Sequence, residues 1–435
     1  MSLMRHAAFN VSAGFSPRDV CVVERFVRYT CNKFFDVWHL TFADNDGASG
    51  SNPLDTVYAF LGHPAAFNAR FNSVLQDMDY ERMAGERSTI VLPDYDTKLF
   101  ALYRNLALAV INGVDSGSDL LRYVAHADEE SLYSDPLPNW VPRYVVSVFH
   151  SGYRRGKLYF LNSTHHCSVK LKSIRWDISA VPRAFAPPAS VYYNASGSLP
   201  RHPLKVIDKT YLRMKAIRID TITFSWTFLD SSWFFIWGTK FKYSVIANGQ
   251  AISNEDSNPV EYLWAAFEKR RASLPNGHLN DIVAYCTTLT AGLTGNAKPV
   301  GSNSRSHFAN FCAYRLAKAE RWGIPQLPPG TRAQLEEDSK EGDADQYFCD
   351  VERACGNRAF FCTEKGYIGL GPRVMGDEDE VWLPMGSMVP FVLRSTYGRH
   401  GDCYRVLGQA YVHGFMEGEA VRDLEEDDFQ EIVLC

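Results

Sequence analysis

The 435-residue sequence lacks the short motifs by which many enzymes are identified. It contains no G-x-x-x-x-G-K-[ST] phosphate loop, no G-x-S-x-G nucleophile turn and no H-E-x-x-H zinc helix. Ten cysteines are present, but no two of them form a C-x-x-C pair. These absences exclude the common nucleotide-phosphate, serine-hydrolase and zinc-protease sites. We expect the cysteines to be reduced thiols.

Long apolar runs and a strong excess of charge are also missing. The amino terminus has no apolar stretch typical of a signal peptide, and residues 231–237 are far fewer than the roughly 20 that a membrane-spanning helix needs. Lys and Arg number 45 against 50 Asp and Glu, a net charge of −5, so neither nucleic acid nor a membrane is an expected partner. The sequence predicts a soluble, cytoplasmic protein.

Three local clusters could in principle carry chemistry. Cys349, Cys355 and Cys362 are spaced by six and seven residues, which does not match a zinc ribbon or finger. The His-His-Cys run at 165–167 favours an edge-strand pair, because adjacent strand residues face opposite sides of a sheet. The glycines of 366–371 resemble half of a dinucleotide loop, but strand–turn–strand glycines are the better interpretation. We predict no catalytic, cofactor-binding or metal-binding residues, and a Cys/His nucleophile pair stays open because nothing selects one combination.

Helical and strand patterns alternate along the chain in four blocks. We predict an α+β fold with a helical region over 1–143, an irregular β-rich region over 144–257, a second helical region over 258–355 and a small β-domain over 356–435. The last block is expected to be antiparallel and barrel-like, because glycines punctuate its short strands. Its core is predicted to include Phe360, Tyr367, Val381, Leu383, Phe391 and Leu393.

Individual elements follow from periodicity and capping residues. The clearest helix is predicted over 94–114, and Ser118 is predicted to cap a short helix that ends at Ala127. A continuous helix is predicted over 332–355, and a strand over 212–224.

Two segments have a biased composition. Residues 417–431 hold eight carboxylates and one arginine, which predicts a solvated, poorly ordered end or, alternatively, an acidic interaction tail. Trp226 and the aromatic residues of 233–237 are predicted to lie in the core of the middle region. An exposed aromatic patch for a protein partner is the alternative.

The carboxy-terminal block resembles a known family. Residues 358–372 (RAFFCTEKGYIGLGP) are similar to a stretch of the fungal heterokaryon-incompatibility (HET) domain proteins, "FF.T..GYIGLGP". The segments 376–381, 390–394, 404–408 and 411–419 are similar to that family's "GD.V", "P.VLR", "YR.VG" and "YVHG.M.GE" strands, in the same order. Upstream, 52–62 (NPLDTVYAFLG) resembles "DPRDKVYALLG", 137–142 (LPNWVP) resembles "LPSWVPDW", and 218–222 resembles "V.VDTI".

The family's amino-terminal HET domain is the death effector, and its patterns "LSYVWG" and "WIDALCINQ" are not found here. The resemblance therefore implies the region downstream of the HET domain. It predicts an accessory or regulatory role in non-self recognition and programmed cell death, exerted by contact with a protein partner or effector domain and without a cofactor. We expect no enzyme activity; an enzyme with an unrecognised hydrolase-type site is the alternative.

Overall fold

A computed structural model gives the fold of the chain. It describes residues 54, 58, 91, 93–113, 117–124, 126, 129–133, 137–142, 146–148, 158–160, 193–227, 244–247, 250–253, 263–264, 267, 282–294, 298–322, 329–355 and 358–435. The predicted strands at 169–174 and 234–243, the His-His-Cys run at 165–167 and most of the first helical region lie outside the described residues.

The largest feature is a sheet of eleven strands, most of them antiparallel. Its central order is β11-β12-β13-β15-β4-β9-β10-β14, and a further pairing of β11 with β4 closes a ring of five strands. The strands are β3 (Lys205–Val206), β4 (Leu212–Thr227), β5 (Ser244–Ala247), β6 (Gln250–Ser253), β9 (Arg358–Thr363), β10 (Ile368–Pro372), β11 (Glu380–Pro384), β12 (Phe391–Gly398), β13 (Gly401–Gln409), β14 (Tyr411–Val412) and β15 (Gln430–Leu434).

Strand β4 joins the middle of the chain to its carboxy-terminal part. This strand of 16 residues pairs with β9, where Trp226 lies opposite Phe360, and with β15, where Leu212 lies opposite Leu434. It also pairs with β11, and the register shifts at Trp382. The sheet formed by residues 358–435 is therefore completed by a strand from far earlier in the sequence.

Alternating residues of the sheet belong to two hydrophobic clusters. Val381 and Leu383 of β11 pack in one cluster, whereas Trp382 between them packs in the other. Both faces of the sheet are consequently covered, which explains why several strands read as continuous apolar runs rather than as alternating ones. Of the predicted core residues, Phe360, Val381, Leu383, Phe391 and Leu393 are fully buried, and Tyr367 is half-buried against Phe415.

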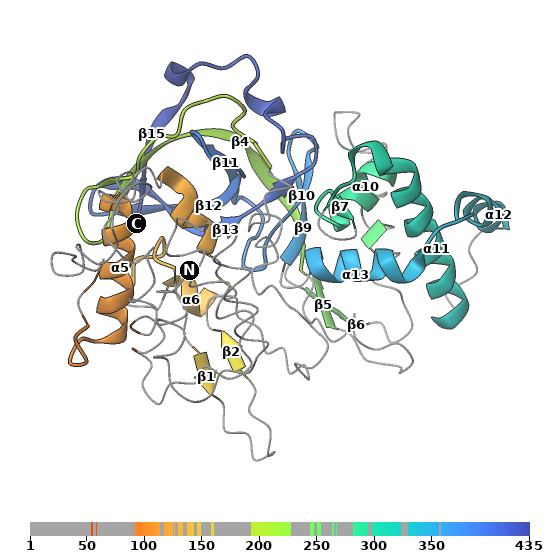
Figure 1. Ribbon diagram of the computed structural model, residues 1–435, viewed down its shortest axis with the longest axis horizontal. Coiled ribbons are helices and arrows are strands. Elements are labelled where there is room, and N and C mark those ends of the chain that lie inside the picture. Colours follow the sequence, from red (N-terminus) through yellow and green to blue (C-terminus); the bar gives the residue numbers. More distant parts are fainter. Residues whose placement is uncertain are drawn as a thin grey trace, which may run out of the picture.

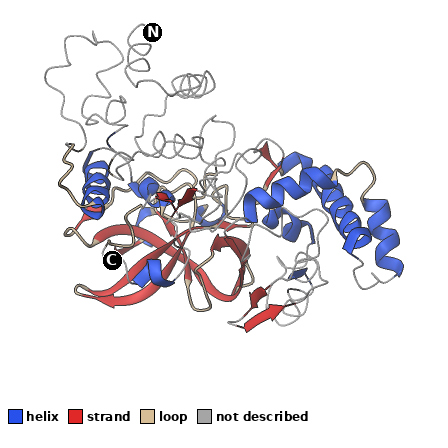
Figure 2. Cartoon of the chain, turned by 90° about the horizontal axis from the view of Figure 1, so that it is seen from below, coloured by secondary structure: helices blue, strands red, loops and turns tan. Residues whose placement is uncertain are grey.

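A group of helices lies at one end of the sheet, beside β9 and β10 (Figures 1 and 2). It consists of α10 (Ile282–Leu289), α11 (Ser304–Trp322), α12 (Pro329–Asp338) and α13 (Ala344–Cys355), together with the short strands β7 (Leu293–Thr294) and β8 (Lys298–Pro299) and the 3-10 helix η5 (Gly301–Asn303). Aromatic rings hold the group to the sheet, because Tyr285 of α10 contacts Phe360 of β9 edge-to-face, with ring centroids 5.7 Å apart.

The helix predicted over 332–355 is in fact two helices, α12 and α13. The chain turns between them at Glu341, whose φ is 66°, and at Gly342. A Cβ atom on Gly342 would lie 2.2 Å from the carbonyl oxygen of Ala309, so only glycine lets the turn approach α11 this closely. Asn310 accepts a hydrogen bond of 2.7 Å from the amide of Asp343 and fixes the start of α13.

The described part of the first region packs on the opposite end of the sheet. It includes α5 (Leu99–Gly113), the 3-10 helix η3 (Gly117–Tyr123) and α6 (Glu129–Tyr133). The strands β1 (Val146–Val148) and β2 (Leu158–Phe160) belong to the next region and form a separate two-stranded sheet. Helix α5 begins five residues after the predicted start, because the Asp94 side chain accepts hydrogen bonds from Asp96 and Thr97 and forms a local turn. The helix predicted after Ser118 is the 3-10 helix η3.

The acidic residues of 417–431 are solvated, as predicted, but the prediction that this end is poorly ordered was wrong. Residues 417–435 form the 3-10 helices η6 (Glu419–Val421) and η7 (Glu426–Asp428) and the strand β15. Lys215 of β4 contacts Glu426 at 2.8 Å, and Arg213 of β4 contacts Glu431 at 3.5 Å. Glu426 and Glu431 thus face basic residues of β4, and Phe429 between them is buried.

Candidate functional site

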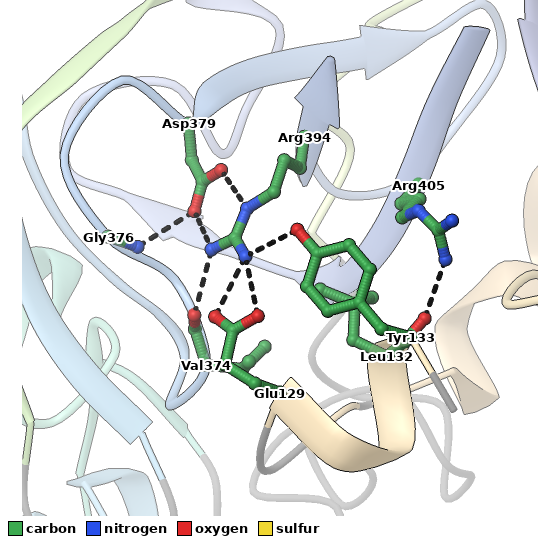
Figure 3. A network of polar contacts seen from close by, with 8 residues as sticks. All are labelled: Glu129, Leu132, Tyr133, Val374, Gly376, Asp379, Arg394 and Arg405. Atoms are coloured by element: carbon green, nitrogen blue, oxygen red, sulfur yellow. Dashed lines mark hydrogen bonds and ion pairs between the residues drawn. The ribbon is translucent and has the colours of Figure 1, made fainter. Parts of the chain in front are cut away.

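Two arginines from neighbouring strands mark the most elaborate polar cluster of the described residues (Figure 3). Arg394 of β12 and Arg405 of β13 lie directly opposite each other in the strand register. Like charges in such a pair repel one another, so the arrangement is stable only if other groups take up the positive charge. Helix α6 and the loop before β11 supply those groups.

The guanidinium of Arg394 uses all of its donors (Figure 3). Its Nε and Nη2 atoms donate to the two carboxylate oxygens of Asp379 at 2.7 and 2.9 Å, and Nη2 also donates to the carbonyl of Val374 at 3.1 Å. Its Nη1 atom donates to Glu129 at 2.8 Å and to the hydroxyl of Tyr133 at 3.2 Å. An arginine has five N–H groups, and each has an acceptor here.

Asp379 is the buried anion of the cluster, with 2% of its side chain exposed. Burial raises the pKa of this carboxyl, and the hydrogen bonds and charge of Arg394 act in the opposite direction. The same partnership raises the pKa of Arg394 above its already high ordinary value. The loop is held in place because the Gly376 amide donates to Asp379 at 2.7 Å, and Ile222 of β4 donates to the Asp379 carbonyl at 2.8 Å.

Helix α6 is bound to the sheet through three of its five residues. Glu129 and Tyr133 contact Arg394, as described above. Leu132 is buried in the hydrophobic cluster that contains Val381, and its carbonyl accepts a hydrogen bond of 2.7 Å from Arg405. The guanidinium of Arg405 also lies 4.7 Å from the ring centre of Tyr133, a distance typical of a cation–π contact. We call this arrangement of Arg394, Arg405 and Asp379 around α6 the α6 dock.

The α6 dock is equipped to bind a segment of chain, and it lacks the groups of a reactive centre. Arg394 has no N–H left for a substrate, and both oxygens of Asp379 are occupied by Arg394 and Gly376. In the described residues, no group of three or more His, Cys, Asp or Glu side chains could hold a metal ion. The geometry suits recognition of a short segment that carries an acidic, an aliphatic and an aromatic residue, as Glu129, Leu132 and Tyr133 do in α6.

Of the clusters weighed in the sequence, the three cysteines and the glycines of 366–371 lie among the described residues, whereas the His-His-Cys run at 165–167 does not. Cys349 is exposed on α13, whereas Cys355 and Cys362 are buried, so the three do not converge. The glycines of 366–371 fall at a turn and in β10, as the strand–turn–strand interpretation requires. Trp226 is buried in the core, as predicted, and residues 233–237 lie outside the described part.

Sequence reasoning missed the α6 dock. The partners of Arg394 lie 15 and 265 residues away, and no local pattern joins them. One signal was present, because Arg394 is the last residue of the "P.VLR" segment and Asp379 lies within the "GD.V" segment.

Comparison with known proteins finds a domain match in the carboxy-terminal part of the chain, where most strands of the ring lie. Residues 330–432 match the family described as the Het-6 beta-barrel domain. The chain is also 29% identical over 145 residues to the heterokaryon incompatibility protein 6, OR allele, of Neurospora crassa. The aligned part is 31% of this chain and 21% of that relative, so the chain matches about a fifth of the relative's length. No solved structure matches the chain.

These two matches confirm the predicted resemblance to fungal heterokaryon-incompatibility proteins. They also confirm a mixed fold in which a carboxy-terminal sheet region coincides with the matched domain. Among the helices that the structure describes, none is both long enough and apolar enough to cross a membrane.

Proposed function

We propose that this chain is an accessory or regulatory part of a fungal heterokaryon-incompatibility system. It acts by protein contact in the cytoplasm during non-self recognition and programmed cell death, and it performs no catalysis of its own. Its ring of strands serves as a small barrel that holds other segments. The effector is a separate domain or protein that this region restrains or positions.

The α6 dock is the observation that carries this proposal. Buried charged groups are common in catalytic sites. In such a site at least one hydrogen-bond donor, base or metal-coordination position is left free for the substrate. In the α6 dock, the two arginines instead donate hydrogen bonds to Glu129, Leu132 and Tyr133 of helix α6. The sheet region thus binds a short helical segment through charge and shape, which is the activity expected of an interaction module.

The proposal is tested in Neurospora crassa, the organism of the matched relative. The segment of heterokaryon incompatibility protein 6 that aligns with this chain is replaced by the corresponding segment of this chain. We expect the chimaera to keep the incompatibility reaction, scored as growth arrest after fusion of unlike strains. Expression of this chain alone should leave growth unchanged.

Two variants sharpen the experiment. Arg394→Met in the full chain removes the centre of the α6 dock, whereas Arg213→Met removes an exposed arginine of the same sheet. In a binding assay against the effector part of the relative, the first variant should weaken binding and the second should not. Growth arrest caused by this chain alone, or consumption of NAD by the purified chain, would favour the enzyme alternative and contradict the proposal.

A further inference from the structure

The receiving side of the α6 dock is held in shape by contacts that do not involve α6. The Arg394 guanidinium is fixed by the Asp379 carboxylate at 2.7 and 2.9 Å and by the carbonyl of Val374 at 3.1 Å. The Asp379 side chain is fixed by the amide of Gly376, and its carbonyl accepts from the amide of Ile222. A surface whose charged groups are oriented in advance keeps its shape when the bound segment leaves.

The chain on both sides of α6 is anchored to β13. His126 and Asn139 are buried, and Nε2 of His126 lies 3.0 Å from the carbonyl oxygen of Asn139. The amide of His126 donates to the carbonyl of Leu407, and the side-chain oxygen of Asn139 accepts from the amide of Val406. These anchors do not depend on the dock, so α6 can leave the dock while the chain before and after it stays on β13.

Helix α6 is held less firmly than the groups that receive it. It has five residues, which is too few for a helix to be stable without tertiary contacts. The side chain of Glu129 is 61% exposed and Tyr133 is 49% exposed, so water competes for their contacts with Arg394. Within the described part of the chain, Arg405 pairs with no carboxylate, and its buried Nε atom has no acceptor (Figure 3). Helix α6 therefore leaves the dock incompletely satisfied.

The dock and its occupant also belong to different parts of the protein. Asp379, Arg394 and Arg405 all lie within residues 330–432, the range that matches the Het-6 beta-barrel domain, whereas α6 lies far before that range. The charged groups of the binding surface are thus supplied by one domain, and the bound segment comes from outside it. Such a surface is suited to accept an equivalent helical segment from another protein.

We infer that α6 is an exchangeable occupant of the α6 dock, and that the dock takes in its place a short helical segment of a separate protein. That segment carries an acidic residue, an aliphatic residue three positions later and an aromatic residue four positions later, because Glu129, Leu132 and Tyr133 have this spacing and share one helix face. Its acid pairs with Arg394, and its ring lies against Arg405. The inference rests on the proposed function, to which it adds the chemistry of the partner and inhibition of its binding by α6.

The test measures how a fluorescein-labelled peptide with the sequence of residues 127–135 binds to the purified full chain, by fluorescence anisotropy. The double variant Leu132→Asp/Tyr133→Ala weakens the hold of α6 and leaves Asp379, Arg394 and Arg405 unchanged. We expect saturable binding of one peptide per chain to this variant. The wild type should bind the peptide about tenfold more weakly, because α6 competes from within the chain at a high effective concentration. Equal affinity for the two chains would overturn the inference.

A control on the peptide leaves the protein unaltered. Glu129→Lys in the peptide reverses the charge that meets Arg394, so this peptide should show no measurable binding to either chain. If it binds as well as the unaltered peptide, the dock does not read the acidic residue and the inference fails.

Circular dichroism establishes whether the double variant is folded. No saturable binding to a double variant with the wild-type spectrum would also refute the exchange. Where that spectrum is lost, the single variant Tyr133→Ala, which removes a half-exposed ring, replaces it in the same titration. The single variant should gain affinity for the peptide relative to the wild type, but less than tenfold. No gain would count against the inference.

The peptide test and the test of the proposed function can fail separately. Peptide exchange with an inactive chimaera would contradict the proposed function and support the exchange, whereas an active chimaera without peptide exchange would contradict the inference alone. Sedimentation of the wild type tests a second copy of this chain as the source of the segment. A dimer that the double variant fails to form would show exchange of α6 between copies and would rule against a separate partner.

Discussion

Arg394 and Arg358 are two largely buried arginines of one sheet, and they differ in what surrounds them. Arg394 has an acceptor for every N–H group, including a buried carboxylate at 2.7 Å. Arg358 has neutral neighbours, and its pKa is lowered to about 10, whereas the pKa of Arg394 is raised. The same side chain is therefore held by a buried carboxylate at one position and has neutral neighbours at the other.

The difference shows what a buried carboxylate partner does for a buried arginine. Arg394 holds Asp379, so its removal leaves a buried anion without a counter-charge. Arg358 has no such partner among the described residues, so its removal deletes a buried charge and leaves no anion behind. The stability of the protein should therefore respond differently at the two positions.

The largest effect is expected for Arg394→Met. This change leaves Asp379 buried without its counter-charge, which should lower the free energy of unfolding by about 3 to 5 kcal/mol. Denaturation of the full chain in urea measures the loss. Arg358→Met is the matched control, and it should be neutral or stabilising. Equal losses at the two positions would break the comparison.

The pH dependence of Arg394→Met should differ from that of the wild type. Arg394 lowers the pKa of Asp379 against the effect of burial, so its removal raises that pKa further above the ordinary 3.8. A carboxyl with a raised pKa in the folded state stabilises the fold when protonated, so stability is gained as the pH falls through the raised value.

We therefore expect the melting temperature of Arg394→Met to recover towards the wild-type value between neutral pH and about pH 4. Adding Asp379→Asn to this variant should remove the recovery, because the double variant has no carboxyl to protonate. A recovery of the same size in the double variant would mean that another group titrates.

A smaller effect is expected for Tyr133→Phe. The change deletes the hydroxyl that accepts from Arg394 at 3.2 Å and keeps the ring beneath Arg405. Since Tyr133 is half exposed, water replaces the hydroxyl in part, and the loss should be about 0.5 kcal/mol. Tyr133→Ala, which also removes the ring, should lose more in the same urea experiment. Equal losses would show that the cation–π contact contributes nothing.

The smallest effect is expected for Glu426→Gln. The contact of Glu426 with Lys215 at 2.8 Å is exposed, and such pairs contribute little. The pairing lowers the pKa of Glu426, so its contribution is present above the ordinary value of 4.5 and is lost as the pH falls through the lowered value. Melting curves at pH 7 should coincide for the variant and the wild type within error. A clear difference in melting temperature would mean that this exposed pair contributes to stability in the way expected of the buried pair of Arg394 and Asp379.

Much of the sheet could be predicted from the sequence. Short apolar runs and glycine turns predicted a small β-domain over 356–435, where β9 to β15 lie, and five of its six predicted core residues are fully buried. Local patterns suffice for such elements. A strand is recognised by the spacing of its apolar residues, and a turn is recognised by residues such as glycine. The family resemblance was visible for the same reason, since it depends on short ordered motifs.

The α6 dock could not be predicted in this way. It depends on contacts between residues far apart in the chain, such as Glu129 and Arg394. The break at Gly342 was missed because its cause is the backbone of Ala309 on a neighbouring helix.

The position of β4 in the sequence also determines when the sheet can form during synthesis. The strand leaves the ribosome long before its partners β9, β11 and β15. Strands β3 and β5 are close to β4 in the sequence and can pair with it early, but the edges that meet β9, β11 and β15 must wait until nearly the whole chain has been synthesised. Pairing over such separations is slow. The matched domain begins at residue 330 and does not include β4, so a fragment cut at that boundary would lack the strand that closes its ring. A newly made chain is thus most exposed to aggregation and to chaperones during the interval between β4 and β15.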